Sequence, residues 1–222
     1  MALPAGLLLA AAAVTPSWQW SLPAGVSAPH VPADNPMSEA KVALGHRLFY
    51  DADLSIDGTM ACSTCHEQHR GFADGNPTHA GVHGDAGRRN VPGLANVAWR
   101  RVLTWGDPRA SSLEVQAAIP LTGSTPIEMG MASQGGELAR RLGRDACYRR
   151  MFRAAFPGTR GRIDQASVVM ALAAFQRTLL SFDAPADRGD VPAAGAAILA
   201  TNVPPVIRGA TIPTNAFIGC CR

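Results

Sequence analysis

The chain has 222 residues, of which 47% are hydrophobic and 17% are charged. This composition excludes a chain that is disordered throughout, and the length suits one large domain or two small ones. The formal net charge is +3, from 20 basic and 17 acidic residues with no block of basic residues, so the sequence gives nucleic-acid binding no electrostatic basis.

The first 36 residues read as two segments outside the main domain. Residues 1–14 form an apolar run of signal-peptide length that is too short to span a membrane. In most signal peptides a basic residue precedes the apolar run, but none does so here. An alanine-rich N-terminal helix is therefore the alternative. Residues 15–36 contain five prolines and no sustained helical period, which predicts an extended arm laid over a domain surface.

A first helix is predicted over Glu39–Tyr50, with Ser38 as its N-cap. Its apolar residues recur at helical spacing and should face the core: Val42, Leu44, Leu48 and Phe49.

Residues 62–66 read CSTCH, which matches the C-x-x-C-H pattern of c-type haem attachment. The thiols of Cys62 and Cys65 would lie on one helical turn and add to the two vinyl groups of haem. The imidazole of His66 would then reach the iron as its proximal ligand. The sequence therefore predicts one covalently bound haem c, and export to the periplasm suits both this motif and the N-terminal run.

Three other interpretations of the two cysteines are weighed against haem. A thioredoxin-like dithiol would follow a strand, whereas residues 51–60 read as a loop. A zinc site would need a second pair of ligands, and Cys147 is too isolated to supply one. A disulfide between Cys62 and Cys65 would close a very small, strained ring.

The rest of the main domain reads as loops and short helices without a convincing strand. The glycine-rich stretch from Gly71 to Asn96 is long enough to be a functional loop that wraps a cofactor. Ser111 and Glu114 match a capping box that opens a short helix ending before Pro120. Further helices are predicted at Gly136–Arg144, at Asp145–Phe156 and, capped by Asp164, at Gln165–Phe182.

The predicted fold is mainly α, a cytochrome-c-like helical haem domain with long loops over residues 37–188. Residues 189–222 differ in character, because from Val191 onward the only charged residues are Arg208 and Arg222. We interpret residues 189–222 as a disordered tail or as the product of a truncation or frameshift.

A series of short segments carries a resemblance to a known family. In order, they are residues 32–36, 44–51, 54–55, 62–66, 71–75, 87–92, 96, 105, 109–110, 112–116 and 128–129. Together they resemble the N-terminal haem domain of the bacterial di-haem cytochrome c peroxidase family, which includes the methylamine-utilisation di-haem enzymes. The resemblance implies reduction of hydrogen peroxide to water with electrons from a small periplasmic redox protein, a cytochrome c or a cupredoxin.

The resemblance also implies roles for residues in the haem pocket. Glu128 matches the family's distal acid/base, which moves a proton between the peroxide oxygens. Gln116 matches a distal glutamine that hydrogen-bonds bound oxygen species, and Trp105 falls near the tryptophan that relays electrons between the two haems. The alternatives are a solvated carboxylate for Glu128, a surface helix residue for Gln116 and plain core packing for Trp105.

Two loop residues match positions that bind metals in the family. His83 falls within one residue of a histidine that is a detachable distal ligand of the haem iron in some members, and a surface histidine is the alternative. Asn90 matches a ligand of calcium whose other ligands come from the second domain, so calcium is a further expected cofactor.

The sequence departs from the family in one respect. The family's second C-x-x-C-H motif would fall near residue 212, about 150 residues after the first, and this sequence has no histidine after His83. We therefore expect this chain to lack the second, electron-donating haem. The other functions to weigh are a mono-haem electron carrier and an inactive fragment, and the substrate is either peroxide or a partner protein oxidised at a distance.

Overall fold

The computed structural model describes residues 18–107 and 109–185, together with residues 187, 188, 190, 193–195 and 197. Its α-helices are α1 (Glu39–Phe49), α2 (Cys62–Cys65), α3 (Leu113–Thr122), α4 (Gly135–Leu142), α5 (Ala146–Ala155) and α6 (Gln165–Gln176). Its 3-10 helices are η1 (Ala52–Leu54), η2 (Gln68–Arg70), η3 (Val97–Trp99) and η4 (Pro157–Thr159). The described residues form no strand beyond two isolated bridges, which confirms the mainly α prediction.

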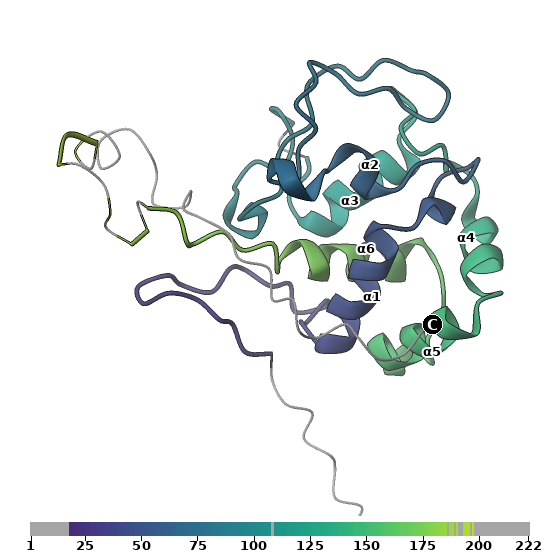
Figure 1. Ribbon diagram of the computed structural model, residues 1–222. Coiled ribbons are helices and arrows are strands. Elements are labelled where there is room, and N and C mark those ends of the chain that lie inside the picture. Colours follow the sequence, from purple (N-terminus) through teal and green to yellow (C-terminus); the bar gives the residue numbers. More distant parts are fainter. Residues whose placement is uncertain are drawn as a thin grey trace, which may run out of the picture.

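The domain is built around the crossing of α1 and α6, with α2 and α3 on one side and α5 on the other (Figure 1). Gly45 lies at this crossing, and a Cβ atom there would come within 1.9 Å of the Ala171 carbonyl oxygen. The rings of Phe49 and Phe175 pack beside it with their centroids 5.2 Å apart. The largely apolar sequence of α6 suits a helix that is buried on nearly its whole circumference.

The predicted starts of α1 and α6 are confirmed by their caps. The Ser38 hydroxyl accepts a hydrogen bond from the Lys41 amide at 3.2 Å. The Asp164 carboxylate accepts from the Ser167 amide at 2.8 Å, and the Ser167 hydroxyl accepts in return from the Asp164 amide. Each cap satisfies amide groups that the first helical turn leaves without an intrahelical partner.

The prediction for α3 was wrong at both ends. Its N-cap is Ser112, whose hydroxyl accepts from the Val115 amide at 3.2 Å, and not Ser111. Pro120 lies inside the helix, which continues to Thr122. A proline there removes one helical hydrogen bond, but the carbonyls of the final turn find other partners, so the helix persists past it.

The prediction for α6 was too long by six residues, since the helix ends at Gln176 and not at Phe182. Asn96 forms hydrogen bonds with the segment that follows α6. The Asn96 amide donates to the Leu179 carbonyl at 2.8 Å, and its side chain exchanges two hydrogen bonds of 2.7 Å with the backbone of Ser181. These contacts hold the segment after α6 in a turn that cannot continue the helix.

A buried polar network ties the N-terminal arm to three helices. Arg177 donates to both carboxylate oxygens of Glu114, at 2.8 and 3.0 Å. Asn35 donates to the same carboxylate at 2.7 Å and accepts at 2.9 Å from Lys41. Burial lowers the pKa of Lys41, although the Glu114 carboxylate opposes this effect. The network joins the arm, α1, α3 and the end of α6.

The arm of residues 18–36 has no helix and lies along the segment that follows α6 (Figure 1). The Trp99 indole donates to the Ser27 carbonyl at 3.0 Å and packs edge-on against Phe182, at 5.4 Å between ring centroids. The predictions for residues 1–14 and for most of residues 189–222 fall outside the described part of the chain.

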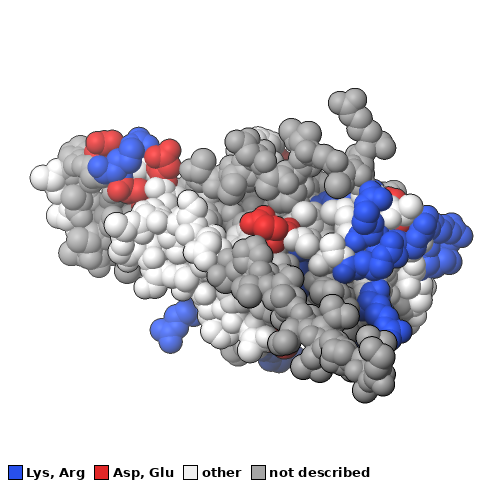
Figure 2. Space-filling view, turned by 90° about the horizontal axis from the view of Figure 1, so that it is seen from below, with Lys and Arg blue, Asp and Glu red and all other residues white. Residues whose placement is uncertain are grey.

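Two surface properties complete the description. Seen from below, Lys and Arg gather at one end of the molecule (Figure 2). Among the described residues, Arg149, Arg150 and Arg153 of α5 are exposed. Within the described residues, no helix has both the length and the apolar character needed to cross a membrane.

Candidate functional site

A cavity of about 620 Å³, part of it open to solvent, lies between α2, α3 and α6. Most of the lining surface is apolar. The lining residues with polar or sulfur-bearing side chains are Met60, Cys62, Cys65, His66, Gln116, Glu128, Met129 and Gln176. The structure therefore brings together five of the residues singled out from the sequence.

The one-turn helix α2 sets the spacing of the two cysteines. The Ala61 amide donates to the Thr64 hydroxyl at 3.0 Å, and the His66 amide donates to the Cys62 carbonyl at 3.0 Å. Cys62 and Cys65 are both free thiols, so the structure does not form the disulfide weighed as an alternative to haem attachment. Burial raises the pKa of both thiols to about 12, and they are thus unlike the acidic thiolates of redox motifs.

His66 is oriented by the turn that follows α2. Its Nδ1 lies 2.7 Å from the Phe72 carbonyl oxygen, so Nε2 is the ring nitrogen that would bind a metal. Phe72 adopts a positive φ of 62°, rare for an aromatic residue, and its amide donates to the Glu67 carbonyl at 2.9 Å. Burial lowers the pKa of His66, which favours the neutral imidazole that coordinates metals.

The segment that carries Glu128 is fixed to the end of α3. The amide of Met129 donates to the Pro120 carbonyl, and that of Met131 donates to the Leu121 carbonyl, each at 3.0 Å. These carbonyls belong to the final helical turn and have no partner within the helix. These acceptors at the end of α3 thus anchor the chain directly after Glu128.

The glycine-rich loop holds the same segment from the other side. The Val82 amide donates to the Glu128 carbonyl at 2.7 Å. A Cβ atom on Gly81 would come within 1.8 Å of the Ile127 carbonyl oxygen, so the loop can pass this close only with glycine at that position. The long loop therefore contributes directly to the position of Glu128.

Glu128 is exposed as a whole residue, but it also lines the cavity, and its carboxyl is partly desolvated. Burial raises the pKa of this carboxyl, and the nearby His79 opposes the effect. A carboxyl with a raised pKa exchanges protons closer to neutral pH than an ordinary glutamate does.

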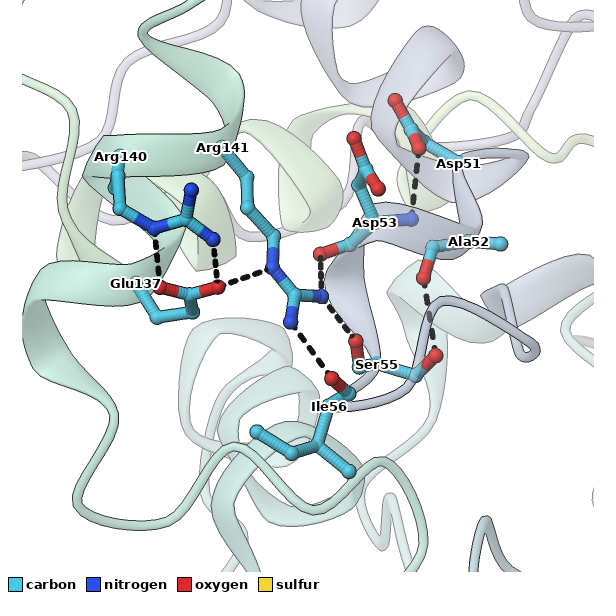
Figure 3. Close-up of polar contacts among 8 residues, drawn as sticks. All are labelled: Asp51, Ala52, Asp53, Ser55, Ile56, Glu137, Arg140 and Arg141. Atoms are coloured by element: carbon cyan, nitrogen blue, oxygen red, sulfur yellow. Dashed lines mark hydrogen bonds and ion pairs between the residues drawn. The ribbon is translucent and has the colours of Figure 1, made fainter.

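Arg141 of α4 fastens the loop between η1 and α2 (Figure 3). It donates to the Ser55 and Ile56 carbonyls, each at 2.6 Å, and to the Glu137 carboxylate at 2.6 Å. The Ile56 amide in turn donates at 2.8 Å to the carbonyl of Met129, the residue after Glu128. Arg141 thus supports the Glu128 segment through one intervening loop.

Three predicted site residues lie outside the cavity lining. Trp105 is 54% exposed, so it is not core packing, and its indole donates to the Asn90 carbonyl at 2.8 Å. His83 and Asn90 are exposed on the glycine-rich loop. No group of three or more His, Cys, Asp or Glu side chains in the described part of the chain could hold a metal ion, and calcium stays a prediction.

Gln176 is the cavity residue that the sequence analysis missed. It is the last residue of α6 and is only 5% exposed. A signal was available, because Gln176 follows Leu172 by four residues and thus falls in the buried stripe of that helix. A polar side chain at such a position is worth testing as part of a site.

The residues around the cavity fit a haem c. Two unbridged thiols on one helical turn, an imidazole whose Nδ1 is held by a backbone carbonyl and a largely apolar lining are the groups that attach, ligate and enclose this cofactor. Gln116 and Glu128 add hydrogen-bonding groups to the lining of the same cavity.

Comparison with known proteins gives a consistent result. The family model for di-haem cytochrome c peroxidase matches residues 39–190. A methylamine utilization protein, MauG of Methylorubrum extorquens, is 42% identical over 173 residues, covering 77% of this chain and 47% of that protein. The cytochrome c peroxidase Ccp of Escherichia coli is 35% identical over 164 residues, covering 72% of this chain and 34% of that protein.

Solved structures agree with this result. A MauG-like protein associated with microbial copper homeostasis superposes with a TM-score of 0.75 at 45% identity, covering 79% of this chain and 51% of that one. The diheme peroxidase BthA of Burkholderia thailandensis superposes with a TM-score of 0.58 at 25% identity, covering 75% of this chain and 48% of that one. The chain spans about one third to one half of the length of these relatives.

Proposed function

The chain belongs to the di-haem cytochrome c peroxidase family, and from this premise we propose that it binds one haem c and reduces hydrogen peroxide to water. The haem would be attached through Cys62 and Cys65 and ligated by Nε2 of His66. One observation carries the proposal: these three residues line the same cavity as Glu128, a carboxyl with a raised pKa.

When bound, haem supplies a redox-active iron at which the O–O bond of peroxide is reduced. The reaction consumes one peroxide, two electrons and two protons and yields two waters. The Glu128 carboxylate accepts a proton from one peroxide oxygen and returns it to the other, so that the leaving oxygen departs as water rather than hydroxide. Gln116 donates or accepts a hydrogen bond that orients the peroxide in the cavity.

The electrons would come from a small redox protein, a cytochrome c or a cupredoxin, in the periplasm. The exposed indole of Trp105 is the residue through which we propose that electrons enter, because its ring lies at the surface while its N–H is held by the loop at Asn90. Because the sequence contains a single C-x-x-C-H motif, we propose that one haem is attached to this chain.

The Glu128→Gln substitution tests the proposal on the full chain produced with the cytochrome c maturation machinery. Peroxide turnover should fall by roughly 10²–10⁴-fold, the usual contribution of a positioned acid/base group, while the haem content stays the same. Glu39→Gln, which changes an exposed carboxylate in the first turn of α1, is the matched control and should leave turnover unchanged. Equal turnover in both variants would remove Glu128 from the mechanism.

A mono-haem electron carrier is the second candidate, and one observation favours it. Met129 is 5% exposed and lines the same cavity, so its thioether could serve as a second axial ligand. A permanently six-coordinate, low-spin spectrum that does not change on adding peroxide would support the carrier. A high-spin spectrum that responds to peroxide supports the peroxidase.

A further inference from the structure

One polar group in the cavity has no role in the proposed chemistry. The amide oxygen Oε1 of Gln176 is buried and has no hydrogen-bond partner among the described residues. The whole residue is 5% exposed, and it lines the cavity together with Gln116 and Glu128. A buried amide without a partner is energetically costly, and folded proteins seldom retain one without a compensating contact.

An apolar residue at position 176 would avoid the cost of burying an amide without a partner. Leu172, one helical turn earlier, lines the same cavity, and residues Ala173 to Phe175 are all buried apolar residues. A leucine or methionine at position 176 would suit this surrounding and would leave no polar atom without a partner. The glutamine is therefore best explained by a hydrogen-bond donor that occupies the cavity.

We propose that Oε1 of Gln176 accepts a hydrogen bond from the O–H group of a small hydroxylic molecule in the cavity, either water or hydrogen peroxide. An amide oxygen carries no proton, so it pairs with an O–H donor and not with a carboxylate. An amide also does not exchange protons at neutral pH, so Gln176 orients this molecule while Glu128 moves the proton. The peroxide alternative rests on the function proposed above.

Gln176→Met tests this inference in the haem-loaded full chain, because methionine keeps the length of the side chain and its helix propensity but removes the acceptor. Gln165→Met, the same substitution at the first residue of α6 and outside the cavity lining, is the matched control. A crystal structure of the haem-loaded protein supplies a second readout that does not depend on activity or on the stability of the variant.

The two sources of the O–H group give different results. If water is the partner, an ordered solvent oxygen lies within about 3.2 Å of Oε1 before peroxide is added, and Gln176→Met loses that oxygen and lowers kcat. If peroxide is the partner, the variant raises KM by about five- to tenfold, the effect of losing one hydrogen bond, and kcat is retained.

The inference is overturned if the crystal structure shows Oε1 bonded only to protein or haem atoms. It is also overturned if Gln176→Met matches Gln165→Met in kcat and KM while the crystal shows no solvent at Oε1. A wild-type protein that carries haem but does not turn over peroxide defeats the proposed function separately. In that case the solvent position at Oε1 still decides the inference.

Discussion

Arg177→Met removes the cation from the most buried ion pair among the described residues, whose side chains are 3% and 15% exposed. Arg177 makes two of the three side-chain hydrogen bonds to the Glu114 carboxylate, and Asn35 makes the third. The variant leaves a largely buried carboxylate with one of these bonds. We expect a loss of about 3–5 kcal/mol in the free energy of unfolding, as is typical for breaking a buried pair.

This loss is large against the total stability of about 5–15 kcal/mol that is usual for a domain. Urea unfolding of the haem-loaded chain, followed by circular dichroism, measures it directly. Arg109→Met is the control, because the Arg109–Asp107 pair lies at the surface, and no measurable change is expected.

A double variant tests the reasoning further. Replacing Glu114 by leucine in the Arg177→Met background removes the unpaired carboxylate and should recover much of the lost stability. A loss below about 1 kcal/mol in the single variant would refute the role given to the network. So would a double variant that is no more stable than the single one.

Three further results are expected. Gly45→Ala should lower the free energy of unfolding, measured with urea, by more than about 3 kcal/mol, because the added Cβ would meet the Ala171 carbonyl oxygen. Gly158→Ala is the control, because a Cβ there meets no atom within 4 Å, and it should leave the free energy of unfolding unchanged. Arg141→Met should cost about 2 kcal/mol and slow peroxide turnover through the loop that supports Glu128, and Arg140→Met should leave turnover unchanged. Because burial raises the pKa of Glu128 and the carboxylate is the active form, turnover should fall as the pH drops through a pKa above 4.5, and Glu128→Gln should abolish this limb of the pH profile.

The helical fold could be predicted where local chemistry decides the structure. Ser38 and Asp164 marked helix starts correctly, because a cap depends on residues within one turn. The ends of α3 and α6 were mispredicted because distant residues decide them. Met129 and Met131 use the last carbonyls of α3, and Asn96 captures the chain beyond α6.

Motifs and the family resemblance predicted part of the site. The C-x-x-C-H spacing and the resemblance named five residues that the fold gathers around one cavity, although they span residues 62–128 of the sequence. Neither of them identified Gln176, because a single glutamine at the end of an apolar helix matches no motif. The support from Arg141 depends on a loop contact between residues about 85 positions apart, which no local pattern encodes.

The mass of the full chain, produced in a periplasm that contains the cytochrome c maturation machinery, tests the central claim most directly. The account predicts a polypeptide heavier by one haem under denaturing conditions. It also predicts that the double substitution of Cys62 and Cys65 by serine abolishes this increase. A wild-type chain with the mass of the bare polypeptide would contradict the account.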